Sequence, residues 1–281
     1  MLFPQNMGAW LSIDEVSLSQ GELYTFVTNK NGKGKKGTLV ASVKGTLSKD
    51  IVAVLEKLSM DKRLAVKEVT LDMAKNMEVA VKTVFPKAIL VTDRFHVVRL
   101  AMEALQHIRI NKRWEELDIE NEAISKAKKE NKKYEPLVLE NGDSPKQLLA
   151  RCRYILTKKK ENWTESQQQR AAILFKRYPE IEHAYHQTLA FRNIYEDRNI
   201  GYAKTRFNNW INEIMEKEIK EFFTVANTVK HNIDNILNFF INRHTNANAE
   251  SFNSKIKLFR ANQRGVVDTK FFLFRLHKLF A

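Results

Sequence analysis

The sequence predicts an α/β protein: a mixed β-sheet flanked by helices, with a large all-helical unit placed within it or after it. Two observations support this. Between residues 10 and 98, short β-branched runs alternate with turn signals and amphipathic stretches in the order β-β-β-α-β-α-β. After residue 98 the strand pattern ends, and apolar residues recur at helical spacing. An antiparallel start followed by crossovers through helices implies a mixed sheet.

The first three strands are predicted to form an antiparallel meander. A short apolar strand ends at Asp14, a β-branched and aromatic run covers residues 24–28, and the turn 29–37 leads into the run 38–43. The remaining elements alternate between helix and strand, as parallel crossovers require. They are a helix that Ser48 caps and that extends to Leu58, a strand over 66–71, a helix over 75–85 and a strand over 89–92.

The second part of the chain is predicted to be helical. Apolar residues follow one another at three-to-five-residue steps up to residue 243, while segment 121–142 is rich in Lys, Glu and Asn and is expected to be solvated. We expect three tryptophans in the core of this part: Trp114, Trp163 and Trp210.

The tail, residues 245–281, is predicted to form amphipathic helices with a dense basic face. Its apolar residues are expected on the buried side of these helices: Phe252, Phe259, Phe271, Phe272, Phe274 and Leu276. The basic residues expected to contact a polyanion are Lys255, Lys257, Arg260 and Arg264.

The charge balance indicates a nucleic-acid partner. Lys and Arg number 47 against 33 acidic residues, which gives a formal net charge of +14. No apolar run approaches the ~18 residues of a membrane span, so no membrane partner is expected. The single cysteine, Cys152, excludes a disulfide framework and a Cys-rich zinc site. No secretory signal is found at the start of the chain, so we expect a cytoplasmic protein.

Two aspartates follow predicted strands. Asp14 ends the first strand and Asp72 ends the strand 66–71. Carboxylates at the ends of neighbouring strands converge on one edge of a sheet. Their mutual repulsion is usually compensated by a divalent cation, and hard oxygen ligands suit Mg²⁺ or Mn²⁺. The alternative is that each aspartate merely caps the following element.

Asp93 and His96 directly follow the strand 89–92 and face each other across one helical turn. The carboxylate can orient the imidazole, which can then donate to a phosphate or move a proton. The alternative is that Asp93 caps the helix and His96 packs internally.

Glu250 is predicted in the first turns of a helix that Thr245 or Asn246 caps. Asn253 shares its face one turn later, together with Ser254, and a lysine follows about two turns on. A carboxylate, an amide and cations on one face suit a metal–phosphate environment, and they equally suit a solvated helix.

Four segments together carry a more specific signal. They are Ile13-Asp14-Glu15, Thr70-Leu71-Asp72-Met73, the Asp-Arg-Phe-His-Val-Val string from Asp93, and the block from Thr245 to Lys257. This arrangement resembles the DDE transposases of the bacterial ISL-three insertion-sequence family, over residues 8–280. The resemblance implies a ribonuclease-H-like core that begins over 8–98, a helical insertion over 99–243, and C-terminal helices over 244–281 that complete the core.

The resemblance also implies roles for the residues at the matching positions. Asp14, Asp72 and Glu250 would be the catalytic carboxylates and would hold two Mg²⁺ ions, with Mn²⁺ as a substitute. Asp93 and His96 would be accessory. A competing assignment makes Asp93 the second catalytic aspartate; Asp72 is preferred because it ends the fourth strand.

The implied activity is metal-dependent cleavage and strand transfer of DNA during movement of an insertion sequence. The implied partners are transposon ends, target DNA and further copies of the chain. Members of the family usually carry an N-terminal zinc-binding and helix-turn-helix region, which we do not find here, so a separately encoded DNA-binding subunit is a further expected partner. The alternatives are a ribonuclease-H-like nuclease or resolvase, and an inert DNA-binding remnant.

Overall fold

The computed structural model describes residues 1–19, 21–244 and 247–281, and it divides the chain into two compact units. Unit 1 comprises Met1–Val97 and Asn232–Ala281, and unit 2 comprises Val98–His231. Unit 1 is therefore assembled from both ends of the sequence. Within the described residues, no helix is both long and apolar enough to cross a membrane.

Unit 1 contains a five-stranded sheet with the order β3-β2-β1-β4-β5. The strands are β1 (Trp10–Ser19), β2 (Glu22–Asn29), β3 (Leu39–Lys44), β4 (Glu68–Leu71) and β5 (Ile89–Thr92). The first three are antiparallel, while β4 pairs in parallel with both β1 and β5. The predicted mixed sheet is confirmed, and its arrangement is ribonuclease-H-like.

β1 is longer than the sequence suggested. It continues to Ser19 and pairs with β2 from Leu11 to that end. Asp14 therefore lies in the middle of the strand, and the expectation that it ends the strand is wrong. The physical reason is that polar and apolar residues alternate beyond Asp14, so the buried Val16 and Leu18 continue the strand while its main chain pairs with β2.

Helices cover both faces of the sheet. α1 (Ser48–Leu55) and α3 (Lys75–Val84) bury Ile51, Leu55, Met77 and Val81 against one face, with α2 (Met60–Leu64) between them in sequence. α1 begins at Ser48 without a side-chain cap, and Leu47 occupies the N-cap position, so the expected Ser48 cap is wrong.

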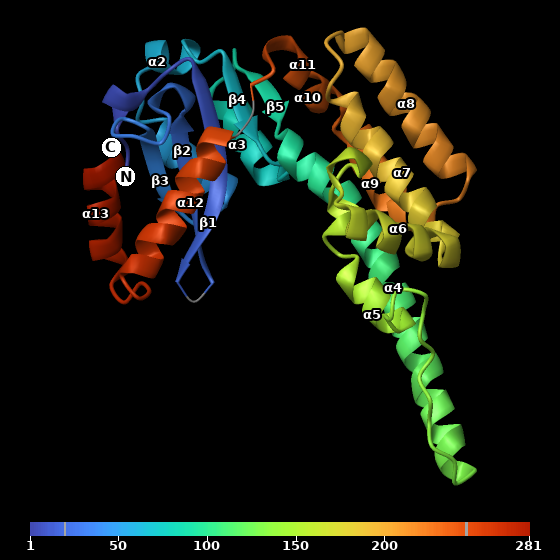
Figure 1. The fold of residues 1–281 in the computed structure, drawn as a ribbon. Coiled ribbons are helices and arrows are strands. Elements are labelled where there is room, and N and C mark those ends of the chain that lie inside the picture. Colours follow the sequence, from blue (N-terminus) through green and yellow to red (C-terminus); the bar gives the residue numbers. More distant parts are fainter. Residues whose placement is uncertain (20, 245–246) are drawn as a thin grey trace. The chain divides into compact units, whose positions relative to one another are not determined.

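On the other face lie α12 (Ala247–Asn262) and α13 (Thr269–Phe280), as Figure 1 shows. Phe252, Phe272 and Leu276 are buried there, as predicted. Phe271 and Phe274 are 55% and 53% exposed, so their expected burial is wrong. α13 presents only one side to the sheet, and these two rings lie on the opposite side.

The chain returns to unit 1 through two short helices, α10 (Ile233–Leu237) and α11 (Phe239–Asn242). α10 packs beside β5, and the side-chain amide of Asn238 donates to the Leu90 carbonyl oxygen at 2.8 Å. The returning segment is thus attached to the last strand that precedes the long helix α4.

Unit 2 is helical, as predicted. α4 (Arg94–Lys129) begins in unit 1 and continues into unit 2. The other helices are α5 (Pro145–Arg151), α6 (Glu165–Arg177), α7 (Pro179–Ile194), α8 (Ile200–Glu216) and α9 (Phe223–His231). Aromatic packing among Phe191, Phe207 and Trp210 lies in its core.

Two of the three tryptophans of unit 2 occupy the core, as predicted, but Trp114 is 59% exposed. Its neighbours Lys112 and Glu116 face the α6–α7 junction, where they pair with Glu180 and Arg177. Trp114 is two residues from each of them, which places it about 160° further round the helix, on the side that faces solvent. Beyond this point α4 extends as an arm with the segment leading back to α5 running alongside (Figure 1), and segment 121–142 is mostly exposed, as expected.

Candidate active site

Three aspartates lie at one level of three neighbouring strands in unit 1. Ser12, Thr70 and Val91 are paired side by side across β1, β4 and β5. Asp14, Asp72 and Asp93 each come two residues after one of these three paired residues. The main-chain N–H of Asp93 donates to the Leu71 carbonyl oxygen at 2.8 Å, so the ladder extends to this level. The strand register therefore gathers three carboxylates that are far apart in sequence.

α12 brings further polar groups to Asp14. Along β1, Val16 and Leu18 pack in the core beneath α12 and α13, and Asp14 points to this same face because side chains alternate. The amide Nδ2 of Asn253 donates to Asp14 Oδ2 at 2.6 Å, across 239 residues of sequence. Phe252, whose ring lies 5.9 Å from that of Phe26, anchors the helix beside this contact.

Glu250 lies one turn before Asn253 on the same helix, and its charge interacts with those of Asp14 and Asp93. Burial raises the pKa of Glu250, and the nearby charge of Asp14 raises it further, whereas His96 opposes the rise. Burial likewise raises the pKa of Asp14, with Asp72 adding to the effect. The charges of Asp14 and His96 both act on Asp93 and on Glu250, and Asp72 acts on Asp14, so the five predicted site residues lie in one neighbourhood. The predicted caps Thr245 and Asn246 lie outside the described residues.

Asp93 is the most deeply buried member, with 2% of its surface exposed. Its Oδ1 accepts the Phe95 main-chain N–H at 3.2 Å. Its Oδ2 accepts no hydrogen bond from the described residues, and His96 Nε2 lies 3.7 Å away. Burial raises the pKa of Asp93 to about 6, and the charges of Glu250 and Asp14 act in the same direction.

Asp72 is partly exposed, and its Oδ1 accepts the Ala74 main-chain N–H at 2.7 Å. Asp14 Oδ1 similarly accepts the N–H of Glu15 at 2.8 Å. The alternative that each aspartate caps the element that follows it therefore accounts for only one oxygen of each carboxylate. The second oxygen of each is the one that other groups can use: Asn253 binds that of Asp14, and no hydrogen bond from the described residues engages that of Asp72.

The chemistry of this donor set suits a hard divalent cation. All its metal-binding atoms are carboxylate or amide oxygens, the carboxylate charges repel one another, and Asp93 Oδ2 accepts no hydrogen bond within the described part of the chain. Among the described residues, no three His, Cys, Asp or Glu side chains lie close enough together to hold a metal ion. The donors are therefore gathered on one face without being drawn around a common point.

A buried polar network lies on the same face of β4, and sequence reasoning missed it. Lys30 Nζ lies 2.9 Å from Glu68 Oε1 and also donates to Thr70 Oγ1. Asn242 Nδ2 donates to Glu68 Oε2 at 3.0 Å, and His244 Nδ1 is 3.2 Å from the same carboxylate. Glu68 is 1% exposed. The network thus ties the segment that precedes α12 to β4.

The predicted DNA-binding residues differ in their surroundings. Lys257 and Arg260 are exposed, and Lys257 follows Glu250 by two helical turns on the same side of α12. Arg264 is exposed in the loop after the helix. Lys255 points elsewhere: its Nζ donates to the Gly34 carbonyl oxygen at 2.6 Å and joins α12 to the β2–β3 turn.

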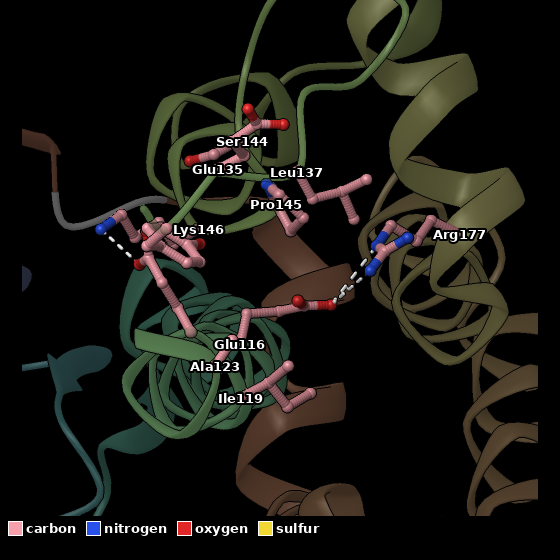
Figure 2. Close-up of a pocket in the computed structure, with 11 residues that line it drawn as sticks. Glu116, Ile119, Ala123, Glu135, Leu137, Ser144, Pro145, Lys146 and Arg177 are labelled. Carbon is pink, nitrogen blue, oxygen red and sulfur yellow. Dashed lines mark hydrogen bonds and ion pairs between the residues drawn. The ribbon is translucent and has the colours of Figure 1, made fainter. Parts of the chain in front are cut away.

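Unit 2 has a cavity of about 200 Å³ between α4 and the segment that runs back to α5 (Figure 2). Its apolar lining includes Ile119, Ala123 and Leu137. Two ion pairs line it: Arg177 Nη2 lies 3.0 Å from Glu116 Oε1, and Lys146 pairs with Glu120. These pairs leave the cavity without a convergent set of reactive groups comparable to that of unit 1.

Comparison with known proteins agrees with the geometry of unit 1. The family model of the ISL3-type DDE transposases, described as a transposase, matches residues 11–276. Neither the curated proteins nor the solved structures provide a match. The matched region includes the three strand-borne aspartates, the helical unit and α12. The chain therefore belongs to the ISL3 family of transposases.

Proposed function

We propose that this transposase cleaves the ends of its element and joins the freed 3′-hydroxyl groups to target DNA, in a metal-dependent reaction. The observation that carries this proposal is the convergence of Asp14, Asp72 and α12 on one face of the sheet, sealed by the 2.6 Å contact between Asn253 and Asp14. Carboxylates gathered from distant parts of a chain are costly unless they serve a charged ligand.

Asp14, Asp72 and Glu250 are the proposed ligands of Mg²⁺, for which Mn²⁺ would substitute. Bound there, divalent ions would supply activation of the attacking oxygen and stabilisation of the departing oxygen in an in-line phosphoryl displacement. The surrounding groups orient the ligands: the Ala74 N–H holds one oxygen of Asp72, and Asn253 holds one of Asp14.

Asp72 is preferred to Asp93 as the second ligand. It is partly exposed and follows β4, the direct neighbour of β1, whereas Asp93 is buried and one strand further away. The buried Asp93 carboxylate lies within 3.7 Å of His96, so its proposed role is to orient that imidazole toward a DNA phosphate.

Lys257, Arg260 and Arg264 are proposed to hold the DNA backbone next to the site. They are exposed, and the two helical residues continue from Glu250 along α12. Lys255 contributes indirectly, since its contact with Gly34 holds α12 against the β2–β3 turn.

The test uses Asp72→Asn, with Asp61→Asn as the matched control because Asp61 is an exposed acid of α2 in the same unit. Purified proteins are incubated with Mg²⁺ and DNA carrying the element's ends, either intact or pre-cut with a free 3′-hydroxyl. We expect wild type and Asp61→Asn to cleave and join, and Asp72→Asn to do neither while still binding DNA. Hydrolysis without joining would indicate a nuclease instead, and an inert wild type would refute the proposal.

A further inference from the structure

The outer side of α13 has an unusual composition. It consists of Lys270, Phe271, Phe274, Arg275 and Lys278, which we call the α13 outer face. All five side chains are exposed, and the two rings expose more than half of their surface. The helix contains no acidic residue; Asp268 precedes it and caps it by accepting the main-chain N–H groups of the first two members.

Cations and rings lie close together on this face. The guanidinium carbon of Arg275 lies 5.9 Å from the centre of the Phe271 ring and 5.3 Å from that of Phe259. The Lys278 ammonium lies 5.7 Å from the centre of the Phe274 ring. Each exposed ring therefore has a positive charge beside it, and three positive charges accompany two aromatic surfaces.

The opposite side of α13 is firmly held. Phe272 and Leu276 are buried against the sheet. His277 Nε2 lies 2.9 Å from Ser42 Oγ of β3, and its ring is 5.1 Å from that of Phe3. These contacts fix the rotation of α13 about its own axis. The two aromatic rings of the outer face therefore stay exposed.

We infer that the α13 outer face binds unpaired nucleotides of a DNA strand, an inference that rests on the proposed action on DNA. The cations match a phosphate backbone, and exposed rings match the flat faces of unstacked bases. A duplex hides those base faces inside its own stack and gives the rings nothing to contact. The same face of a second copy would bring three further positive charges against these three, so charge complementarity favours the polyanion.

The spacing of the rings suits this ligand. Phe271 and Phe274 are three residues apart, which separates them by about 4.5 Å along the helix axis. Neighbouring unpaired bases can occupy positions of this spacing on a flexible strand. The face therefore offers two adjacent stacking positions flanked by cations.

The test measures binding of the full chain to a fluorescent single strand and to the duplex of the same sequence, at several salt concentrations. The key variant is the double change Phe271→Leu and Phe274→Leu, which keeps apolar area and removes the aromatic faces. Tyr202→Ala is the control, because Tyr202 is an equally exposed aromatic residue of unit 2. Thermal melting checks that each variant is folded.

We expect the double leucine variant to bind the single strand about 25-fold or more weakly, with duplex binding and the salt dependence unchanged. The double change to tyrosine should restore binding. Replacing Lys270 and Lys278 by Gln should instead reduce the salt slope for the single strand by about 1.4, as expected for two lost phosphate contacts. The fluorescence of an oligonucleotide with 2-aminopurine should change on binding to wild type, because the base leaves its neighbours, and should not change with the leucine variant.

Equal single-strand binding by wild type and the leucine variant would overturn the inference. The inference would also fail if wild type does not bind the single strand and the leucine variant still binds anionic lipid vesicles. That result would identify a membrane surface as the ligand. A wild-type dimer that dissociates when Phe271 and Phe274 are both replaced by Ala would overturn the inference as well. Cleavage assays on wild type and Asp72→Asn separate the two proposals. If neither protein cleaves DNA but both still bind the single strand, the result counts against the proposed function only.

Discussion

Asp93 provides the sharpest prediction about stability. Replacing it by Asn keeps the shape of the side chain and the acceptor for the Phe95 N–H, and removes a negative charge buried beside Glu250 and Asp14. We therefore expect Asp93→Asn to stabilise unit 1 at neutral pH while impairing any function of the carboxylate.

The magnitude follows from the pKa. Burial raises the pKa of Asp93 from 3.8 to about 6, a difference worth about 3 kcal/mol in the free energy of unfolding. The folded state holds this proton more tightly than the unfolded state does. The contribution of Asp93 to the free energy of unfolding is therefore greatest below pH 4, and it is lost as the pH rises through 6. The advantage of Asp93→Asn should thus grow from near zero at pH 4 to about 1–3 kcal/mol at pH 7.

The assay is denaturant unfolding at pH 4, 5, 6 and 7 in a metal-chelating buffer, because a bound cation would favour the charged carboxylate. Asp61→Asn is the control; as an exposed substitution it should stay within about 0.5 kcal/mol of wild type at every pH. A difference between Asp93→Asn and wild type that does not change with pH, or a less stable variant at pH 7, would refute the reasoning.

Three further predictions concern other parts of unit 1. Glu68→Gln should lower the free energy of unfolding by about 3–5 kcal/mol, because it leaves the charge of Lys30 buried without its partner. In the same unfolding measurement, Glu22→Gln in an exposed ion pair should cost less than about 1 kcal/mol. His277, whose pKa burial lowers to about 4, binds fewer protons when folded, so its own contribution to stability should fall as the pH drops from 6.5 to 4, opposite in sign to that of Asp93, and His277→Gln should remove this contribution. Lys257→Gln should reduce the salt slope of duplex binding by about 0.9, and Lys255→Gln should leave it unchanged but lower the melting temperature.

Local sequence pattern was sufficient for the sheet. β-branched runs separated by turns predicted all five strands, and the alternation of helix and strand predicted the parallel pairing of β4 with β5. The gathering of Asp14 and Asp72 followed from the same logic, because parallel register aligns residues at equivalent positions. The full length of β1 was not predicted: Glu15, Ser17 and Ser19 interrupt the apolar run, and only their alternation with the buried Val16 and Leu18 marks the rest of the strand.

The remaining features depend on long-range packing that no local pattern encodes. Lys30 lies in a lysine-rich turn and would be assigned to solvent, yet it is buried because Glu68 supplies its counter-charge from another strand. The contact of Asn253 with Asp14 joins segments 239 residues apart. Phe271 and Phe274 fit the buried side by composition alone; only the orientation of α13 against the sheet reveals which aromatic residues are covered.

The attachment of Asn238 to the Leu90 carbonyl closes a loop across 148 residues, which has a kinetic consequence. Closing so long a loop as an unstructured chain is entropically unfavourable, and contacts of such high sequence separation slow folding. Helices of the intervening segment form from local contacts and shorten the effective distance between its ends. We therefore expect that segment to collapse first, and the docking of α10 on β5 to be the slow event that precedes completion of the proposed active site.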